Sequence, residues 1–500
     1  MSRRATREAL LALDLDRTVV TPMQRQLYDQ LRGLILRRGL PAETRLPSTR
    51  SLAADLGVSR NTIVGAFDQL LAEGYLVSQV GSGTYVSPVL PDSLLDAGAT
   101  PGPSPQSPSP SGGSRPRLSR RGRALAASVN PRTSSHRAFT PGLPALDEFP
   151  FQLWARLLAR PWRKPAARLL AFGDPAGDRD LRAEIAAYLG AVRAVRCDAE
   201  QVIIVSGAQH GLDIATRVLL DPGDAALVEE PGYVGAWGAL TGAGVDLVSV
   251  PVDEEGLDIA AGERRAPDAR LACVAPSHQY PLGVTMSLRR RLALLDWAAR
   301  RGAWILEDDY DSEYRYAGRP LAALQGLDRS GSVIYIGSFS KVLFPSLRLG
   351  YLVVPPDLVR PFRRARAALD DHPSSIAQGA LARFIADGHF AAHVRRTRRL
   401  YAARRQALLE AGNRHLSGLL DFRPSQSGMH LVGMLAPDLA ARLSDRTASA
   451  RLAKAGITAP PLSGYYRGGD VAQGLLLGYA AVPEAEIEPA VRRMAAILAG

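Results

Sequence analysis

The sequence predicts a multidomain chain, in which a small helical module with a terminal β-hairpin precedes a large α/β domain. Three observations predict this fold class. Near the N-terminus, apolar residues recur at helical spacing and two short β-rich runs follow them. Residues 88–135 are rich in Pro, Gly, Ser and Arg. From residue 179 onward, helical patterns alternate with short apolar runs, which is typical of βα units around a mostly parallel sheet.

The composition is that of a globular protein rather than a membrane or disulfide-rich one. Of the 500 residues, 46% are hydrophobic and 22% are charged, which is close to the globular average. No apolar run approaches the roughly 20 residues of a membrane span, and the N-terminus shows no secretory signal. The two cysteines, Cys197 and Cys273, fit no metal-ligand spacing. We therefore expect a cytoplasmic protein without a membrane segment or a metal site.

The charge balance is basic, with 61 basic against 49 acidic residues and a net charge of +12. This balance fits either a polyanionic partner such as nucleic acid or simply an arginine-rich proteome. Only three of the basic residues are lysines, Lys164, Lys341 and Lys454. Chemistry that needs a primary side-chain amine therefore has three candidates.

Residues 88–135 are expected to form an extended linker, because their Pro/Gly/Ser-rich first part cannot bury apolar surface. They would separate an N-terminal module, residues 1–87, from a body, residues 136–500. The arginines that follow favour either a solvated linker or a basic tether that contacts DNA phosphates. They are Arg115, Arg117, Arg120, Arg121, Arg123, Arg132 and Arg137.

The N-terminal module has the pattern of a winged helix-turn-helix. Apolar spacing predicts a helix over 27–35, and Ser48 is placed to cap a second helix over 49–55 that Gly57 ends. Ser59 is placed to cap a third helix. Two β-rich runs, 75–78 and 84–87, then predict a hairpin. This is the geometry of helix-turn-helix DNA-binding domains: a short helix, a turn and a second helix that begins with polar residues. The inward face of the third helix is expected to be Ile63, Phe67, Leu70 and Leu71.

Residues 26–86 resemble the winged helix-turn-helix domain of the GntR family. The resemblance rests on LPSTRSLA at 46–53 and LGVSRNT at 56–62. It implies that the module binds double-stranded operator DNA and that Gly81, at the tip of the wing, approaches the minor groove. The residues expected to meet DNA in the second and third helices are Arg50, Ser59, Arg60, Asn61 and Thr62.

In the body, chemistry-bearing residues follow five apolar runs that are expected to be strands. Ligands bind beyond the carboxyl ends of the strands in such sheets. The five ends offer small residues at a helix start, an aromatic ring, a polar loop, carboxylates and one of the three lysines. This set suits pyridoxal 5′-phosphate (PLP), which needs a lysine, a carboxylate for its pyridine nitrogen and donors for its phosphate. The segments are SGAQ at 206–209, EPGY at 230–233, SHQYPLG at 277–283, EDDY at 307–310, and SFSK at 338–341 followed by Arg348.

The body, residues 136–500, resembles fold-type I aminotransferases, with a large part at about 175–360 and a small part at about 361–500. Together with the GntR-like module it resembles the MocR/GabR-type regulators, including the PdxR-like regulators of pyridoxine biosynthesis. The resemblance implies that Lys341 forms a Schiff base with PLP and that Asp308 contacts the pyridine nitrogen. It implies that Tyr310 contacts the ring hydroxyl, that Tyr233 stacks on the ring and that Gln279 belongs to the site. The residues implied for the phosphate are Ala208, Gln209, Ser338, Ser340 and Arg348.

Three positions depart from the resemblance. Phe172 stands where a tyrosine usually reaches the partner subunit's phosphate, and Gly235 stands where the GABA-sensing member has an arginine. Near Leu476 there is no arginine where aminotransferases bind the α-carboxylate. These departures predict that PLP itself, rather than an α-amino acid, is the effector. The alternative is that another arginine, such as Arg423, supplies a carboxylate clamp.

The resulting hypothesis is a PLP-binding transcriptional regulator that senses PLP, or an amine or amino acid, and forms a head-to-tail homodimer as the fold family does. It predicts that the aminotransferase-like domain serves for sensing. The alternative is an active PLP-dependent aminotransferase that carries a vestigial DNA-binding module.

Overall fold

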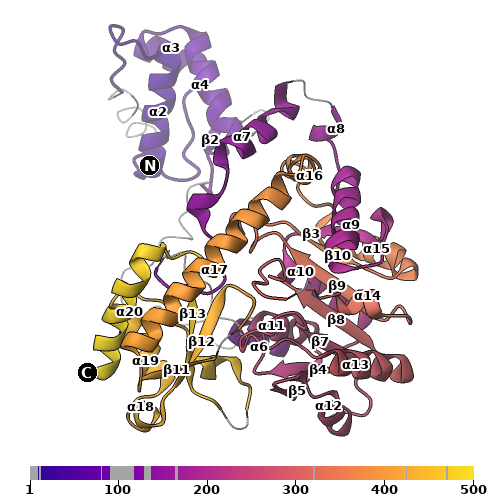
Figure 1. The fold of residues 1–500 in the computed structure, drawn as a ribbon. Coiled ribbons are helices and arrows are strands. Elements are labelled where there is room, and N and C mark those ends of the chain that lie inside the picture. Colours follow the sequence, from indigo (N-terminus) through magenta and orange to yellow (C-terminus); the bar gives the residue numbers. More distant parts are fainter. Residues whose placement is uncertain are drawn as a thin grey trace. The chain divides into compact units, whose positions relative to one another are not determined.

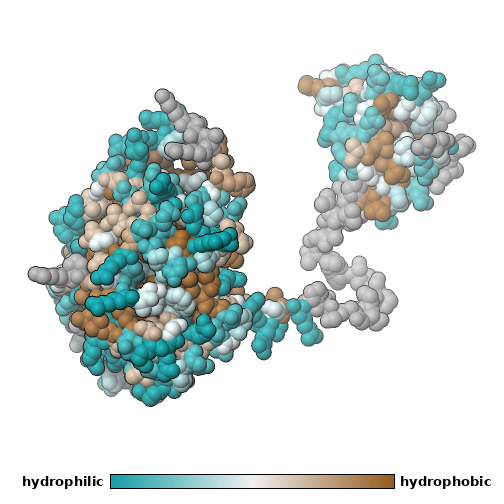
Figure 2. All heavy atoms as spheres, turned by 90° about the vertical axis from the view of Figure 1, so that its right-hand side faces the viewer, coloured by the Kyte–Doolittle hydropathy of each residue, from teal (hydrophilic) through white to brown (hydrophobic). Residues whose placement is uncertain are grey.

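The computed structural model describes residues 10, 13–79, 82–90, 117–128, 137–163, 167–318, 321–423, 425–468 and 471–500. The chain divides into two units, Met1–Arg115 and Pro116–Gly500 (Figure 1). None of the helices in the described ranges is long and apolar enough to cross a bilayer. On the face that Figure 2 shows, both units expose hydrophobic residues among hydrophilic ones.

The first unit has the expected helices and hairpin. Ser48 accepts a hydrogen bond from the Ser51 backbone N–H at 3.1 Å and begins the short second helix, while Gly57 ends that helix with φ +64°. The wing strands pair antiparallel, Leu76 opposite Val86. They lie within one residue of the predicted runs. The elements are α2 (Met23–Leu36), α3 (Thr49–Leu56), α4 (Arg60–Ala72), β1 (Leu76–Gln79) and β2 (Gly83–Val86).

The core of this unit differs from the expectation at one position. Ile63, Phe67 and Leu70 are buried as predicted, but Leu71 is only half-buried. Ala66 takes the fourth inward position instead. The reason is the 3.6-residue period of the helix, which places residues 63, 66, 67 and 70 on one stripe and turns residue 71 toward its edge.

The second unit is built on a mixed sheet with the order β3-β10-β9-β8-β7-β4-β5-β6. The pairs β4·β5, β4·β7, β7·β8 and β8·β9 are parallel. β10 lies antiparallel between β3 and β9, so these two strands run in the same direction. The strands are β3 (Val202–Val205), β4 (Ala225–Glu230), β5 (Asp246–Asp253), β6 (Gly256–Leu257), β7 (Leu271–Val274), β8 (Trp304–Asp309), β9 (Val333–Ser338) and β10 (Gly350–Val353).

Helices cover both faces of this sheet. Leu306 of β8 packs in one cluster with residues of α10 and α11, whereas its neighbour Ile305 packs on the other side with residues of α13. This alternation is what a strand buried on both faces requires. The helices before and around the sheet are α6 (Arg120–Ser128), α7 (Phe151–Ala159), α8 (Ala167–Leu170), α9 (Arg179–Arg193), α10 (Ala208–Leu219), α11 (Val234–Ala243), α12 (Ile259–Arg265), α13 (Leu288–Arg301), α14 (Leu324–Leu327), α15 (Val359–Asp370) and α16 (Gln378–Ala386).

A smaller antiparallel sheet, β11-β12-β13, completes the unit, and the long helix α17 packs against α20 beside it (Figure 1). The backbone of Gly478, the last residue of β13, donates to Phe139 O at 2.9 Å and so joins this sheet to the start of the body. The elements are α17 (His389–His415), β11 (Leu420–Arg423), β12 (His430–Leu435), α18 (Pro437–Arg442), α19 (Asp445–Lys454), β13 (Gly474–Gly478) and α20 (Glu484–Ala499).

Part of the expected linker is helical. Much of residues 88–135 lies outside the described residues, but α6 forms within it and packs against α11. Ser119 Oγ accepts a hydrogen bond from the Gly122 backbone N–H at 2.9 Å, which caps the helix start. The sequence of α6 is made mostly of Arg, Ala and Leu, which are good helix formers. The helix propensity of residues 120–128 is therefore high enough for a helix to form, although the stretch before them is rich in proline.

A buried ion pair fixes the end of β8. Arg193, the last residue of α9, donates from Nε to Asp309 Oδ2 at 2.9 Å and from a terminal nitrogen to Ser277 Oγ at 2.6 Å. Arg193 is 4% exposed and Asp309 is 5% exposed. The pair therefore ties α9 to the carboxyl ends of β7 and β8 in a region from which water is excluded.

Removing Arg193 should strongly destabilise this unit. Arg193→Ala leaves the Asp309 carboxylate buried without its cationic partner, which typically costs about 3–5 kcal/mol. As a control, Arg217→Ala removes an exposed i,i+4 partner of Asp213 and should cost no more than about 0.5 kcal/mol. Urea unfolding followed by circular dichroism compares the two midpoints. Equal midpoints would show that the buried pair does not stabilise the sheet.

Candidate cofactor site and DNA-reading surface

Five strands of the large sheet end at one edge. β4, β7, β8 and β9 are linked by parallel pairing, and β3 runs in the direction of β9. Their carboxyl ends therefore lie together, as the sequence predicted. The segments that follow these strands hold Gln209, Tyr233, Gln279, Tyr310 and Lys341.

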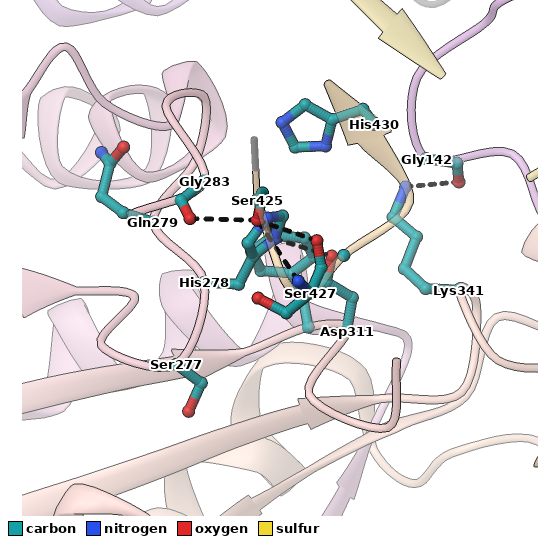
Figure 3. A network of polar contacts seen from close by, with 12 residues as sticks. Gly142, Ser277, His278, Gln279, Gly283, Asp311, Lys341, Ser425, Ser427 and His430 are labelled. Atoms are coloured by element: carbon teal, nitrogen blue, oxygen red, sulfur yellow. Dashed lines mark hydrogen bonds and ion pairs between the residues drawn. The ribbon is translucent and has the colours of Figure 1, made fainter. Parts of the chain in front are cut away.

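Lys341 follows β9, and its side chain is half-buried. Its Nζ donates a hydrogen bond to Gly142 O at 2.9 Å (Figure 3). A Cβ on Gly142 would lie 2.5 Å from this Nζ, and the φ of Gly142 is +69°. Glycine is thus the residue that lets the backbone approach the amine. Sequence reasoning missed Gly142, because nothing local connects it to a lysine 199 residues away.

Asp308 is the buried acid of the site. It lies in β8, and its Oδ1 is buried without a hydrogen-bond partner among the described residues. Burial raises the pKa of Asp308 to about 7, with further raising contributions from Asp309 and Asp311, while Lys341 lowers it. A buried acceptor without a donor is costly. The site therefore presents a carboxyl group that a cationic N–H of a ligand would satisfy.

Tyr233 and Asp308 line the same small cavity, together with Trp237 and residues of β4 and β7. Tyr233 stands directly before α11, and its ring lies over Gly235. A Cβ on Gly235 would be 2.4 Å from the Tyr233 ring and 2.5 Å from Gln209 Oε1. An arginine at position 235 would therefore displace the aromatic ring. Gln209 Nε2 donates to Gly235 O at 2.9 Å and holds this arrangement.

Arg348 lies beside the start of α10, and we call this pair the anion-binding corner after the chemistry that it suits. Gly207 precedes α10 with φ +95°, and a Cβ there would lie 3.4 Å from a terminal nitrogen of Arg348. The first backbone N–H groups of a helix, here those of Ala208 and Gln209, have no partner within the helix and favour an anion. Ser340 lies close to Ser338, since its backbone N–H donates to Ser338 Oγ at 3.2 Å.

The Gln279 side chain makes its hydrogen bonds away from Lys341. Its Nε2 donates to Pro231 O at 2.7 Å and lies 3.3 Å from Glu229 Oε2. In Figure 3 its side chain extends away from Lys341. The structure thus places Gln279 as a brace that holds the loop before Tyr233. Burial raises the pKa of Glu229 to about 8.

Two further residues complete the site. His278 and Asp311 are buried, and His278 Nδ1 lies 2.9 Å from the Tyr310 hydroxyl and 3.0 Å from Asp311 Oδ2. Sequence reasoning quoted His278 within a motif without giving it a role and missed Asp311. The signal was present: an acid directly after EDDY and a histidine at the neighbouring strand end.

The positions that depart from the aminotransferase pattern are placed as follows. Phe172 is 85% exposed and makes an edge contact with His372, with ring centroids 6.0 Å apart. Leu476 is fully buried in an apolar cluster with Val432 and Leu462, so its own side chain presents no charged group at this point of β13. Arg423, at the end of β11, is exposed.

The expected DNA-reading residues lie on α3 and at the start of α4. Arg50, Arg60 and Asn61 are exposed. Ser59 and Thr62 are partly used by the helix itself, because Ser59 Oγ accepts from the Thr62 N–H at 3.2 Å and lies 2.8 Å from Thr62 Oγ1. Gly81 lies outside the described residues.

Comparison with known proteins identifies both units. Residues 23–86 match the bacterial regulatory proteins of the gntR family, and residues 149–494 match aminotransferase class I and II. The chain is 45% identical over 471 residues to the probable rhizopine catabolism regulatory protein MocR of Rhizobium meliloti. The matched stretch covers 94% of this chain and 92% of that protein. The chain belongs to the MocR-type transcriptional regulators. This MocR-type regulator is also 34% identical over 461 residues to the pyridoxine biosynthesis regulator PdxR of Corynebacterium glutamicum, with 92% of each chain covered.

Solved structures support the same fold for the body of this MocR-type regulator. It is similar to a kynurenine aminotransferase of Pyrococcus horikoshii in complex with PMP, with a TM-score of 0.67, 28% identity, and coverage of 77% of this chain and 95% of that one. It is also similar to LysN of Thermus thermophilus, an α-aminoadipate aminotransferase complexed with a phosphopyridoxyl-leucine, with a TM-score of 0.67, 30% identity, and coverage of 76% and 95%. The named relatives that span both domains are regulators rather than enzymes. The aminotransferase-like domain of this chain is therefore part of a transcriptional regulator, in which it is joined to a DNA-binding domain.

Proposed function

We propose that this MocR-type regulator binds PLP beside Lys341 and that PLP controls its binding to operator DNA. The observation that carries the proposal is the buried Oδ1 of Asp308, which has no hydrogen-bond partner among the described residues and lies in the cavity that Tyr233 also lines. A protonated pyridine nitrogen satisfies that oxygen, and an aromatic ring fits against Tyr233. The anion-binding corner of Gly207 and Arg348 suits the phosphate. The fold relatives that carry PMP or a phosphopyridoxyl group support this fit.

Each residue has a distinct task in this proposal. Asp308 holds the pyridine nitrogen, Tyr233 covers the ring and Tyr310 donates to the ring hydroxyl. Lys341 supplies the primary amine of the site, and the cofactor, when bound, would supply an electrophilic carbon that reacts with primary amines. The phosphate is held by the residues of the anion-binding corner and the β9 loop, which are Ala208, Gln209, Ser338, Ser340 and Arg348.

The regulator would act as a cytoplasmic homodimer with its bodies arranged head to tail. Large apolar side chains that a monomer leaves exposed support a partner surface; they include Phe151, Leu170, Phe172 and Ile376. Two copies place two DNA-binding modules on one operator, which suits a repeated or palindromic site. In each module, Arg50, Arg60 and Asn61 would read DNA while Ser59 and Thr62 hold the start of α4.

The proposed effector is PLP rather than an α-amino acid. Leu476 is buried among apolar residues and Gly235 has no space for a longer side chain, so neither position offers a guanidinium to a carboxylate. The relative named for pyridoxine biosynthesis supports this choice. The relative named for rhizopine catabolism supports the competing choice of another small molecule.

Lys341 should be the residue that PLP labels. The protein incubated with PLP should gain a visible absorption band, because a conjugated lysine–PLP linkage absorbs in the visible range. Borohydride reduction followed by peptide mapping should place the label on Lys341, and Lys341→Ala should lose it. Lys454→Ala is the matched control and should keep it. Label on another lysine, or no band at saturating PLP, would overturn the cofactor site.

Arg50→Ala and Arg60→Ala should each weaken operator binding by roughly 1–3 kcal/mol if the arginines make bidentate base contacts. Binding should fall with salt, with a logarithmic slope of about −0.9 per phosphate contacted. Arg25→Ala is the control, because Arg25 pairs with Asp29 on α2. Electrophoretic mobility shift across a salt series measures all three. Unaltered operator affinity in both Arg50→Ala and Arg60→Ala would contradict the assigned DNA-reading surface. PLP binding should be retained in both variants.

Adding PLP to the depleted protein should shift its operator affinity, typically by 5- to 150-fold for a coupling of about 1–3 kcal/mol. Because coupling is reciprocal, operator DNA should change the Kd for PLP by the same factor. Fluorescence anisotropy with a panel of amines and amino acids tests the effector. An amino acid that shifts DNA affinity and perturbs the cofactor band, while PLP alone does not, would overturn this choice. Sustained turnover with 2-oxoglutarate, well above that of free PLP, would favour the aminotransferase alternative.

A further inference from the structure

We propose that His278 and Asp311 form a positioning pair that turns the Tyr310 hydroxyl proton toward the bound cofactor. The inference rests on the proposed binding of PLP beside Lys341, and it adds two residues to that site. Neither is part of the proposed cofactor-binding set. Figure 3 shows His278 and Asp311 in one polar network with Ser425 and Ser427, and Lys341 beside it.

The geometry brings two polar groups, the Tyr310 hydroxyl and the Asp311 carboxyl, to one ring nitrogen of His278. His278 Nδ1 lies 3.0 Å from Asp311 Oδ2 and 2.9 Å from the Tyr310 hydroxyl. His278 is 2% exposed and Asp311 is 1% exposed, so water does not compete for these contacts. A buried acid and a buried imidazole at hydrogen-bond distance fix each other's orientation.

This arrangement decides the direction of the Tyr310 proton. A carboxylate only accepts hydrogen bonds, so the proton between His278 and Asp311 belongs to Nδ1. The same N–H also faces the Tyr310 oxygen, which therefore acts as an acceptor toward His278. Burial, followed by Asp311, raises the pKa of Tyr310 well above its usual value, so the phenol keeps its proton at neutral pH. That proton is then free to point away from His278, toward the ring hydroxyl of PLP.

The backbone locks the imidazole in this position. A Cβ on Gly428 would fall 1.9 Å from a carbon of the His278 ring, and one on Gly283 would fall 3.0 Å from its Nε2. Both glycines have positive φ, +90° and +75°. The ring therefore fits between two backbone segments that only glycine allows to approach so closely. His278 Nε2 has no hydrogen-bond partner within the described residues, so Nδ1 makes the polar contacts of the ring.

The neighbouring histidine does not compete for this role. The His430 ring lies 5.2 Å from that of His278, and its Nε2 lies 2.9 Å from Pro281 O. Burial, followed by the neighbouring His278, lowers the pKa of His430 to about 3. It stays neutral and donates to the Pro281 carbonyl. Of the two, only His278 makes the contacts that join Tyr310 to an acid.

The test is the pH titration of the visible band of bound PLP, which follows the proton that the ring hydroxyl shares with its neighbouring nitrogen. A donor to the ring oxygen stabilises its deprotonated form, so losing that donor should raise the midpoint. Tyr310→Phe should raise it by about one to two pH units. Asp311→Asn should also raise the midpoint, because the imidazole can then accept a hydrogen bond from the Tyr310 hydroxyl, which no longer points toward the ring oxygen. His278→Phe should also raise it, whereas His278→Asn, which keeps an N–H near the Nδ1 position, should stay close to the wild type.

The double variant separates positioning from a merely structural role. If Asp311 acts through Tyr310, Asp311→Asn should add no further shift in the Tyr310→Phe background. His415→Asn is the matched control, since His415 pairs with Glu488 at 2.8 Å on the small part, and it should leave the midpoint unchanged. Thermal unfolding of each variant confirms that it is folded.

The outcomes distinguish this inference from the proposed function. A wild-type protein without a visible band overturns the cofactor proposal and the inference together. A wild-type band with a shift in Tyr310→Phe, but none in Asp311→Asn and His278→Phe, overturns the positioning pair alone. The positioning pair is also overturned if Asp311→Asn shifts the titration midpoint equally in the wild type and in Tyr310→Phe. It is overturned as well if Tyr310→Phe itself leaves the midpoint unchanged.

Discussion

The structure depends on how the end of β8 accommodates buried carboxyl groups. Glu307, Asp308, Asp309 and Asp311 lie within five residues and are all buried. Burying a charge without a partner is costly, so each group needs a donor or must hold its proton. Burial raises the pKa of both Glu307 and Asp308 to about 7. The elements around this strand end are arranged to meet that demand.

Three of these acids have hydrogen-bond or ion-pair partners within the protein. Glu307 accepts the backbone N–H groups of Leu324 and Gln325 at 2.7 and 2.8 Å and thereby starts α14. Asp309 pairs with Arg193 of α9, and Asp311 pairs with His278 after β7. Each contact joins β8 to a different element, and together they define the edge of the sheet at which the site lies. Asp308 and Asp309 each keep a buried Oδ1 without a hydrogen-bond partner among the described residues, but of the two it is Asp308 that lines the cavity beside Tyr233. The same constraint thus stabilises the fold and leaves a place for a cationic ring nitrogen.

Much of this could be predicted from the sequence, because the signals are local. Apolar runs followed by polar motifs located the ends of five parallel strands, and helix caps such as Ser48 and Ser59 marked the first module. What escaped prediction depends on contacts between distant residues. The antiparallel insertion of β10 between β3 and β9 leaves no local signature, and the approach of Gly142 to Lys341 joins segments 199 residues apart. Gln279 has the right place in the chain, but its amide is turned toward Pro231.

The site also explains how a catalytic fold can serve as a sensor. A ligand shifts a conformational equilibrium only through its different affinity for the two states. A cofactor that contacts Asp308, Tyr233, Lys341 and the start of α10 binds segments that follow different strands, so its binding energy depends on their relative positions. The buried Leu476 and the crowded Gly235 leave these two positions without a group for an α-carboxylate. A domain that keeps the proposed cofactor contacts but lacks substrate recognition would use its binding energy for a conformational signal to the DNA-binding module rather than for turnover.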